Sequence, residues 1–175
     1  MTEYTEMKSP IGVLTLVKED EDAALSGLYM EAQSLPRHVR RCRSATRFAE
    51  ETRQLAEYFD GVRQQFDLVL SVQGTPFQRR VWSALRAIPF ARTVSYAAIA
   101  RAIDKPKAFR AVGAANGLNP ISIVVPCHRV IGSSGALVGY GGGIARKTWL
   151  LSHERSLAAV HADDRNAIVR EHVVG

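Results

Sequence analysis

The chain has 175 residues, 46% of them hydrophobic and 23% charged, with no apolar run long enough to cross a bilayer and no apolar N-terminal stretch typical of a secretory signal. With only two cysteines, Cys42 and Cys127, these features exclude a disulfide-rich secreted domain and lead us to expect a cytoplasmic protein without membrane segments. The net charge of +6 is concentrated in residues 68–155, which hold 12 Lys/Arg but only the acids Asp104 and Glu154, as expected for either a solvated basic face or a surface that binds a polyanion.

The first part of the chain is predicted to form a small sheet-containing domain, residues 1–72, without a visible catalytic motif. Extended runs with Val13, Leu14, Leu16 and Val17 predict a hairpin around the Pro-Gly turn within residues 7–20, and strand-like stretches are expected at 23–30 and 64–72. Residues 46–59 carry apolar side chains at near-helical spacing, which predicts a helix that stops near Gly61.

From Thr75 onward the pattern becomes helical, and we expect a second domain over residues 73–156. Thr75 and Ser95 are placed to cap helices, with Pro76 at the first position of the first one. Helices are predicted at residues 76–88, 95–103, 108–117 and 144–154, and a strand at 121–125. Residues 157–175 lack strong periodicity and are predicted to be a loosely ordered tail.

Two of these helices, joined by the polar turn at residues 104–107, suggest a helix-turn-helix. The second one is slim, since alanines and a glycine fill most of it and Arg110 is its one long polar arm. A slim helix lets its backbone approach a partner closely. That partner is either another helix or the minor groove of DNA, which is narrow and poor in sequence information.

The segment PCHRV (Pro126–Val130) concentrates the reactive residues. Cys127 needs a base or a cationic setting to become a thiolate, and His128 follows it directly. Adjacent side chains of an extended backbone point to opposite faces, so a turn at Pro126 or a bridging water would be needed to couple the two. Glu154 is placed to fix the imidazole tautomer, whereas Arg129 is expected to make structural hydrogen bonds. Taken alone, the Cys-His pair also fits a purely structural role.

Three stretches resemble the O6-alkylguanine-DNA alkyltransferase family, also called methylated-DNA–protein-cysteine methyltransferases: RAVGAANG (Arg110–Gly117), NPISIVVPCHRVIG (Asn119–Gly132) and GYGGGIARKTWLLSHE (Gly139–Glu154). The resemblance is near-continuous from Thr75 to Glu154 and looks like the stand-alone bacterial type. It implies an α+β protein, with a small ribonuclease H-like N-terminal domain holding an antiparallel sheet. The C-terminal domain it implies is mainly helical and winged-helix-like, with a helix-turn-helix.

The resemblance implies a suicide alkyltransferase that repairs DNA. Cys127 would accept the alkyl group, His128 would act as base through a water, and Glu154 would orient His128. Asn119 would tie the recognition helix to the cysteine turn as a hinge, and Tyr140 would donate to the base. The substrate would be O6-alkylguanine with a methyl or larger group, together with O4-alkylthymine. The thioether on Cys127 would be permanent, so each molecule would act once.

The resemblance also implies how DNA is held. Arg110 would fill the space left by the flipped base, Tyr96 would contact the 3′ phosphate, and Lys147 would support the site. The Val125 and Cys127 carbonyls would accept from the exocyclic amine of guanine. The remaining residues expected at the DNA or base are Ala111, Ala114 and Gly141. Gly141 departs from relatives that have Ser there, so a side-chain hydrogen bond to O6 is lost.

We expect double-stranded DNA containing alkylated bases as the partner, bound through the minor groove with little sequence specificity. The protein is expected to be a monomer, and cooperative binding along DNA stays open. No cofactor is expected. No metal is expected either, because the N-terminal region offers only His38 and Cys42. Three other functions stay open: a non-catalytic sensor of alkylated DNA, a cysteine hydrolase, and a transcription factor.

Overall fold

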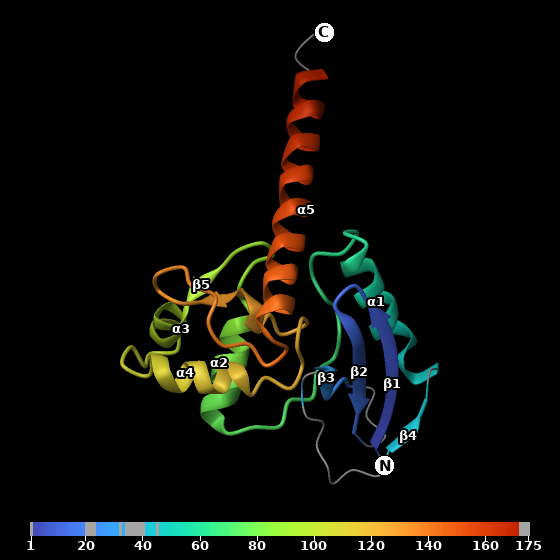
Figure 1. The fold of residues 1–175 in the computed structure, drawn as a ribbon, viewed down its shortest axis with the longest axis vertical. Coiled ribbons are helices and arrows are strands. Elements are labelled where there is room, and N and C mark those ends of the chain that lie inside the picture. The colour runs from blue at the N-terminus through green and yellow to red at the C-terminus, as the bar shows by residue number, and fades with distance from the viewer. Residues whose placement is uncertain (1, 20–23, 32, 34–40, 45, 172–175) are drawn as a thin grey trace.

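The computed structural model describes residues 2–19, 24–31, 33, 41–44 and 46–171, and it is a mixed α/β structure (Figure 1). Four strands form one sheet in the order β3-β2-β1-β4. They are β1 (Thr2–Ser9), β2 (Gly12–Lys18), β3 (Gly27–Met30) and β4 (Arg41–Arg43). The first three pair antiparallel and β4 runs parallel to β1. The predicted hairpin and third strand are therefore confirmed.

The predicted helix over residues 46–59 is also confirmed, as a short 3-10 turn (Thr46–Phe48) followed by α1 (Ala49–Phe59). Its apolar face is fully buried at Leu55 and Tyr58. Gly61 has a φ of +79°, in the left-handed region that glycine adopts readily, so it ends the helix as expected.

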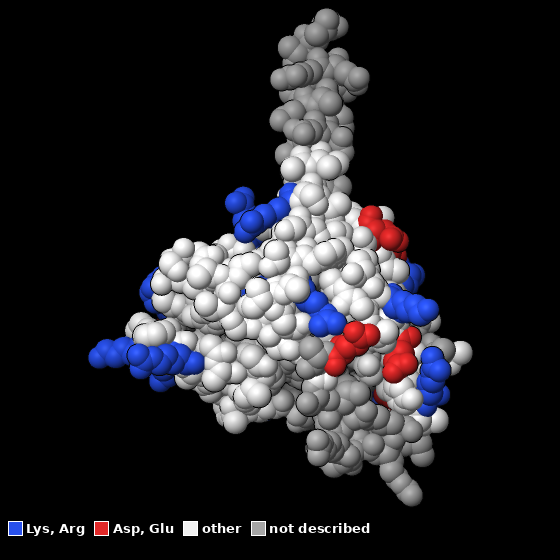
Figure 2. Space-filling model, in the orientation of Figure 1, with Lys and Arg blue, Asp and Glu red and all other residues white. Residues whose placement is uncertain are grey.

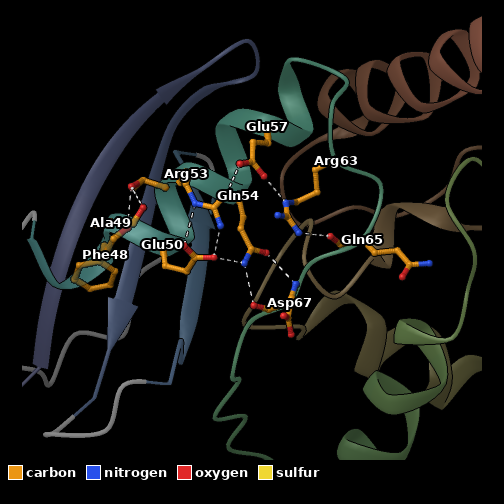
Figure 3. A network of polar contacts seen from close by, with 10 residues as sticks. Phe48, Ala49, Glu50, Arg53, Gln54, Glu57, Arg63, Gln65 and Asp67 are labelled. Carbon is orange, nitrogen blue, oxygen red and sulfur yellow. Dashed lines mark hydrogen bonds and ion pairs between the residues drawn. The ribbon is translucent and has the colours of Figure 1, made fainter.

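The prediction of a strand at residues 64–72 is wrong. This stretch makes only one isolated bridge, between Leu70 and Leu25. Near Asp67 its backbone is held by side chains (Figure 3): the buried Gln54 amide of α1 donates to the Asp67 carbonyl at 2.9 Å and accepts from the Asp67 N–H at 2.9 Å. Arg63 donates to the Gln65 carbonyl at 2.9 Å. Around the bridge, Leu25 N–H donates to the Val69 carbonyl and Ser71 N–H donates to the Leu25 carbonyl, both at 2.9 Å. The groups nearer Asp67 are satisfied by side chains, so pairing does not extend into a strand.

The C-terminal part is mainly helical, with helices α2 (Pro76–Arg86), α3 (Tyr96–Ala102), α4 (Phe109–Gly117) and α5 (Ile144–Glu171). Both predicted caps are present. Thr75 accepts from Gln78 N–H in a capping box, and Ser95 accepts from Ala98 N–H. A small parallel pair, β5 (Val94–Ser95) and β6 (Val130–Ile131), joins the start of α3 to the segment after the cysteine turn.

The predicted strand at residues 121–125 is wrong as well. Ile123 has a φ of +71°, and the chain folds into a turn whose single bridge joins Ile121 to Leu28. The run is apolar because it is buried, with Ile121, Ile123 and Val125 at 0 to 1% exposure, and not because it belongs to a sheet. Leu28 N–H donates to the Pro120 carbonyl at 2.9 Å, so β3 is fastened directly to the chain that leads into the cysteine.

α5 begins at the predicted residue but continues to Glu171, well beyond the predicted end at residue 154. Residues 155–171 contain no Gly or Pro, so nothing in them stops a helix. The end of α5 extends away from the rest of the molecule (Figure 1). How firmly residues 157–175 are held stays a prediction.

The sheet with α1 and the group α2 to α4 lie on opposite sides of α5 (Figure 1). α3 and α4 pack together, and Gly113 of α4 faces the Tyr96 ring, where an added Cβ would lie at the ordinary contact distance of 3.7 Å. Within the described part of the chain, no helix combines the length and apolar character that a bilayer crossing requires.

Candidate active site

Cys127 opens a one-turn 3-10 helix, Cys127–Arg129, directly after Pro126. The predicted turn at Pro126 is thus present. The Cys127 side chain is buried, at 4% exposure. Burial raises the pKa of the thiol, while the nearby Asn119 amide and Lys147 ammonium act in the opposite direction. The resting group is therefore a protected thiol, which needs a base to become a nucleophile.

Glu154, on α5, is the centre of a buried polar cluster. Its Oε1 lies 2.8 Å from His128 Nε2 and accepts from Arg129 Nη2 at 2.9 Å. Its Oε2 accepts from Arg129 Nε at 2.9 Å and from Ala91 N–H at 3.0 Å. Glu154, His128 and Arg129 are 0, 0 and 6% exposed, so water competes little for these groups.

These donors determine which form of His128 is present. Burial alone would raise the pKa of Glu154, but the hydrogen bonds and charges of His128 and Arg129 outweigh it and lower the pKa to about 2. An ionised Glu154 must accept from Nε2–H, which leaves the Nδ1 lone pair free. Nδ1 is buried without a hydrogen-bond partner among the described residues. Burial also lowers the pKa of His128, so the imidazole is neutral near pH 7 and can take a proton.

Arg129 makes the structural hydrogen bonds expected of it. Besides pairing with Glu154, its Nη1 donates to the Ile88 carbonyl at 2.8 Å. The guanidinium also lies over the Phe90 ring, 5.6 Å from its centroid. The buried carboxylate thus has one permanent cationic partner, and His128 does not need to be charged to balance it.

Tyr58 is a residue of this cluster that the sequence did not reveal. Its hydroxyl, at the end of α1, donates to Glu154 Oε1 at 2.9 Å. Tyr58 lies within the helix predicted over residues 46–59, and it is fully buried. No local signal marks its hydroxyl as part of the site, because its partner is 96 residues away in the chain.

Asn119 connects the end of α4 to the cysteine turn. Its Nδ2 donates to the Val125 carbonyl at 2.8 Å, and its Oδ1 accepts from Ile121 N–H at 3.1 Å. The Val125 carbonyl also accepts from Cys127 N–H at 2.8 Å. The Cys127 carbonyl accepts from Val130 N–H and, at 3.4 Å, from Asn116 Nδ2. The Val125 and Cys127 carbonyls, which the resemblance assigns to the exocyclic amine of guanine, therefore already accept hydrogen bonds from the protein itself. Their role in binding guanine stays a prediction.

The loop before α5 is fastened by two residues predicted at the site. Lys147 Nζ donates to the Val130 and Val138 carbonyls at 2.6 and 3.0 Å, and Tyr96 Oη donates to the same Val138 carbonyl at 3.1 Å. The Tyr140 hydroxyl is buried without a partner among the described residues. Burial, followed by the charge of a Cys127 thiolate, raises the pKa of Tyr140 well above its ordinary value. Gly141 is exposed, and a Cβ there would lie 3.0 Å from Gln33 Nε2.

Three predicted residues lie away from the thiol, on the exposed face of α4. Arg110, Ala111 and Ala114 all face solvent, and Arg110 lies over the Phe109 ring, with its guanidinium carbon 5.6 Å from the centroid. Exposed basic residues gather at this end of the molecule (Figure 2); they are Arg101, Lys105, Lys107 and Arg110. The acidic side chains visible in Figure 2 lie on the side of the sheet and α1.

No group of three or more His, Cys, Asp or Glu within the described ranges is arranged to hold a metal ion. Cys42 is exposed, and His38 lies outside the described residues.

Comparisons with known proteins agree on one family. The model of the DNA-binding domain of 6-O-methylguanine DNA methyltransferase matches residues 76–156. A methylated-DNA–protein-cysteine methyltransferase of Mycolicibacterium paratuberculosis is 51% identical over 89% of this chain and 93% of its own. One from Methanosarcina acetivorans is 42% identical over 87% of this chain and 98% of its own. The crystal structure of Mycobacterium tuberculosis OGT in complex with DNA matches with a TM-score of 0.84 at 48% identity, covering 89% of this chain and 94% of that one.

Proposed function

This chain belongs to the methylated-DNA–protein-cysteine methyltransferase family, and we propose that it moves an alkyl group from O6 of guanine in DNA onto its own Cys127, once per molecule. The observation that carries the proposal is the relay Cys127–His128–Glu154. A buried thiol directly precedes a neutral histidine whose Nε2–H is fixed by an ionised carboxylate and whose Nδ1 is free to accept a proton.

In the proposed reaction, His128 Nδ1 takes the thiol proton through a bridging water, and Glu154 stabilises the imidazolium that forms. The thiolate then attacks the alkyl carbon. The S–C bond forms as the C–O6 bond breaks, and its electron pair leaves with the guanine. Tyr140 donates a hydrogen bond to guanine N3 and so stabilises the negative charge that develops on the base. The imidazolium releases the thiol proton to solvent and the guanine anion takes up one proton in exchange, so the proton lost by Cys127 is the one gained by guanine and Tyr140 stays protonated.

The raised pKa of Tyr140 suits this role, because the phenol stays protonated and can donate throughout the working pH range. Lys147 would support it with positive charge near the thiolate. The product is a thioether without a group placed to hydrolyse it. We therefore propose single turnover.

For DNA, we propose that the exposed face of α4 enters the minor groove and that the damaged nucleotide is flipped out toward Cys127. Flipping costs a few kcal/mol, part of which Arg110 offsets by occupying the vacancy. Ala111 and Ala114 would let the helix backbone come close, and Tyr96 would contact the 3′ phosphate. Minor-groove contacts of this kind distinguish few base sequences, which suits a protein that must find damage at any position in DNA. A DNA complex is known for the Mycobacterium tuberculosis relative.

Two further points belong to the proposal. The substrate would include O6-alkyl groups larger than methyl, because the loop over residues 139–143 is built largely of glycine, and O4-alkylthymine as well. Residues 1–72 would form a structural domain of ribonuclease H-like type, and residues 73–156 a winged-helix-like domain that carries the chemistry.

The test is the mass of the intact protein after mixing with a duplex that holds one O6-methylguanine, followed by peptide mapping. We expect one added methyl group, on Cys127. The Cys127→Ser variant should gain no mass but should keep its affinity for the duplex, because the substitution changes one atom of a buried side chain. A wild-type protein that binds the damaged duplex tightly without gaining mass would favour the non-catalytic sensor.

A further inference from the structure

Tyr58 reaches the reactive cluster from the N-terminal part of the chain. We propose that Tyr58 is a positioning residue that sets the hydrogen-bond acceptor strength and orientation of Glu154, and through it the readiness of His128 to take a proton. This inference rests on the proposed function of the site. It gives the N-terminal helix α1 an indirect part in the chemistry, through Glu154.

The first argument is the sharing of one oxygen atom. Tyr58 Oη and His128 Nε2 both contact Glu154 Oε1, at 2.9 and 2.8 Å. Each hydrogen bond that a carboxylate oxygen accepts neutralises part of its negative charge. The oxygen then accepts any further hydrogen bond less strongly. The Tyr58 hydroxyl therefore weakens the pull of Oε1 on the imidazole.

The second argument is that Tyr58 can only donate. Glu154 is ionised and offers no proton, and burial together with the Glu154 charge raises the pKa of Tyr58 well above its ordinary value. The phenol is therefore uncharged near neutral pH, and its O–H donates to Oε1. Arg129 contributes a fixed charge to Glu154, whereas Tyr58 contributes a neutral hydrogen bond.

The third argument is rigidity. The Tyr58 ring is enclosed by other aromatic residues, with centroids 5.3 Å from Phe59, 5.4 Å from Phe66, 6.3 Å from Phe90 and 5.4 Å from His153. The Tyr58 carbonyl also lies 2.9 Å from His153 Nε2. A phenol packed on several sides cannot swing away, so it holds the carboxylate in one orientation.

The other charged and titratable groups around the relay must be considered before a pH effect is predicted. His128 is faced by Glu154, Arg129 and Lys147. Glu154 is faced by His128, Arg129 and Tyr58, and it lies near Tyr140. Arg129 and Lys147 keep the pKa of His128 low, and Tyr58 acts in the same direction by weakening Glu154 as an acceptor. Loss of the Tyr58 hydroxyl should therefore raise the pKa of His128.

The test is the rate of a single turnover on the damaged duplex as a function of pH, for wild type and Tyr58→Phe. We expect the acidic limb of the profile, where His128 becomes protonated, to move upward by roughly half a pH unit. The rate at neutral pH should fall roughly threefold to tenfold, the order of a typical hydrogen bond, because Glu154 and the imidazole it orients are held less firmly. Phe66→Leu is the matched control, since it alters the same aromatic cluster without touching Glu154 and should leave the limb in place.

A second measurement covers the case in which Tyr58→Phe does not fold. With 3-fluorotyrosine in place of Tyr58, the hydroxyl is kept but donates more strongly, so the limb should move toward lower pH. A limb that stays in place in both variants, or that moves equally in Phe66→Leu, would overturn the inference. Failure of the proposed function can be told apart from failure of this inference. In the former case, wild type itself would not acquire the methyl group on Cys127.

Discussion

The Glu154→Gln substitution tests whether the buried cluster is held together by charge. The amide keeps the shape of the carboxylate but removes its charge, while Arg129 stays buried at 6% exposure. Removing one partner of a buried ion pair costs about 3–5 kcal/mol, because the other charge is left uncompensated. The pKa of Glu154 supplies an independent value. Its fall from 4.5 to about 2 corresponds to about 3 kcal/mol of stabilisation, at about 1.4 kcal/mol for each tenfold change in proton affinity.

Both arguments give a loss of about 3 kcal/mol or more, a large share of the about 5–15 kcal/mol by which domains are usually stable. The assay is urea unfolding at pH 7, where the midpoint should fall with little change in slope. The control is the double variant Glu154→Gln/Arg129→Met, which also removes the orphaned cation. It should recover at least half of the lost stability while alkyl transfer stays impaired, because His128 still lacks its anionic partner. If the free energy of unfolding of Glu154→Gln alone lies within about 1 kcal/mol of that of wild type, this account of the cluster is refuted.

Three further outcomes are expected. Stability should fall between pH 4.5 and about 2, because the pKa of Glu154 is lowered on folding and its contribution is present above 4.5 and lost as pH drops through the folded value; urea midpoints across this range should fall less steeply in Glu154→Gln. Arg110→Ala should slow repair of paired duplex by roughly tenfold or more, since the vacancy in the stack is left unfilled, but should hardly change reaction with a free alkylated base; equal losses would argue against the finger role. Thr75→Ala should lower the free energy of unfolding by about 1 kcal/mol through loss of the α2 capping box, and an unchanged urea midpoint would mean that the cap contributes nothing.

The helices were predictable because their signals are local. Thr75 and Pro76 mark the start of α2, and Ser95 marks that of α3, within a few residues of the groups they satisfy. Strands at residues 64–72 and 121–125 were predicted wrongly because a strand depends on a distant partner. The Gln54 amide takes the place of a sheet neighbour in the first segment, and Ile123 turns the chain with a positive φ in the second.

In the active site too, residues marked by local sequence were predicted, and residues that depend on distant contacts were not. Cys127 and His128 stand together in the sequence, and Glu154 is a rare acid in a basic segment, so all three were identifiable. Tyr58 was not, because an apolar helical face gives no sign that one hydroxyl on it reaches a carboxylate on another helix. The occupied carbonyls of Val125 and Cys127 were equally hidden, since their donors become visible only once the turn is folded.

The most direct test of suicide transfer is its stoichiometry. Protein at a fixed concentration is mixed with increasing amounts of duplex containing O6-methylguanine, and repaired guanine is counted after the reaction is complete. Our account predicts a plateau at one repaired guanine for each molecule of protein, with every Cys127 alkylated at the plateau. Repaired guanine that continues to rise beyond the amount of protein would show turnover, and it would contradict the proposed permanent thioether.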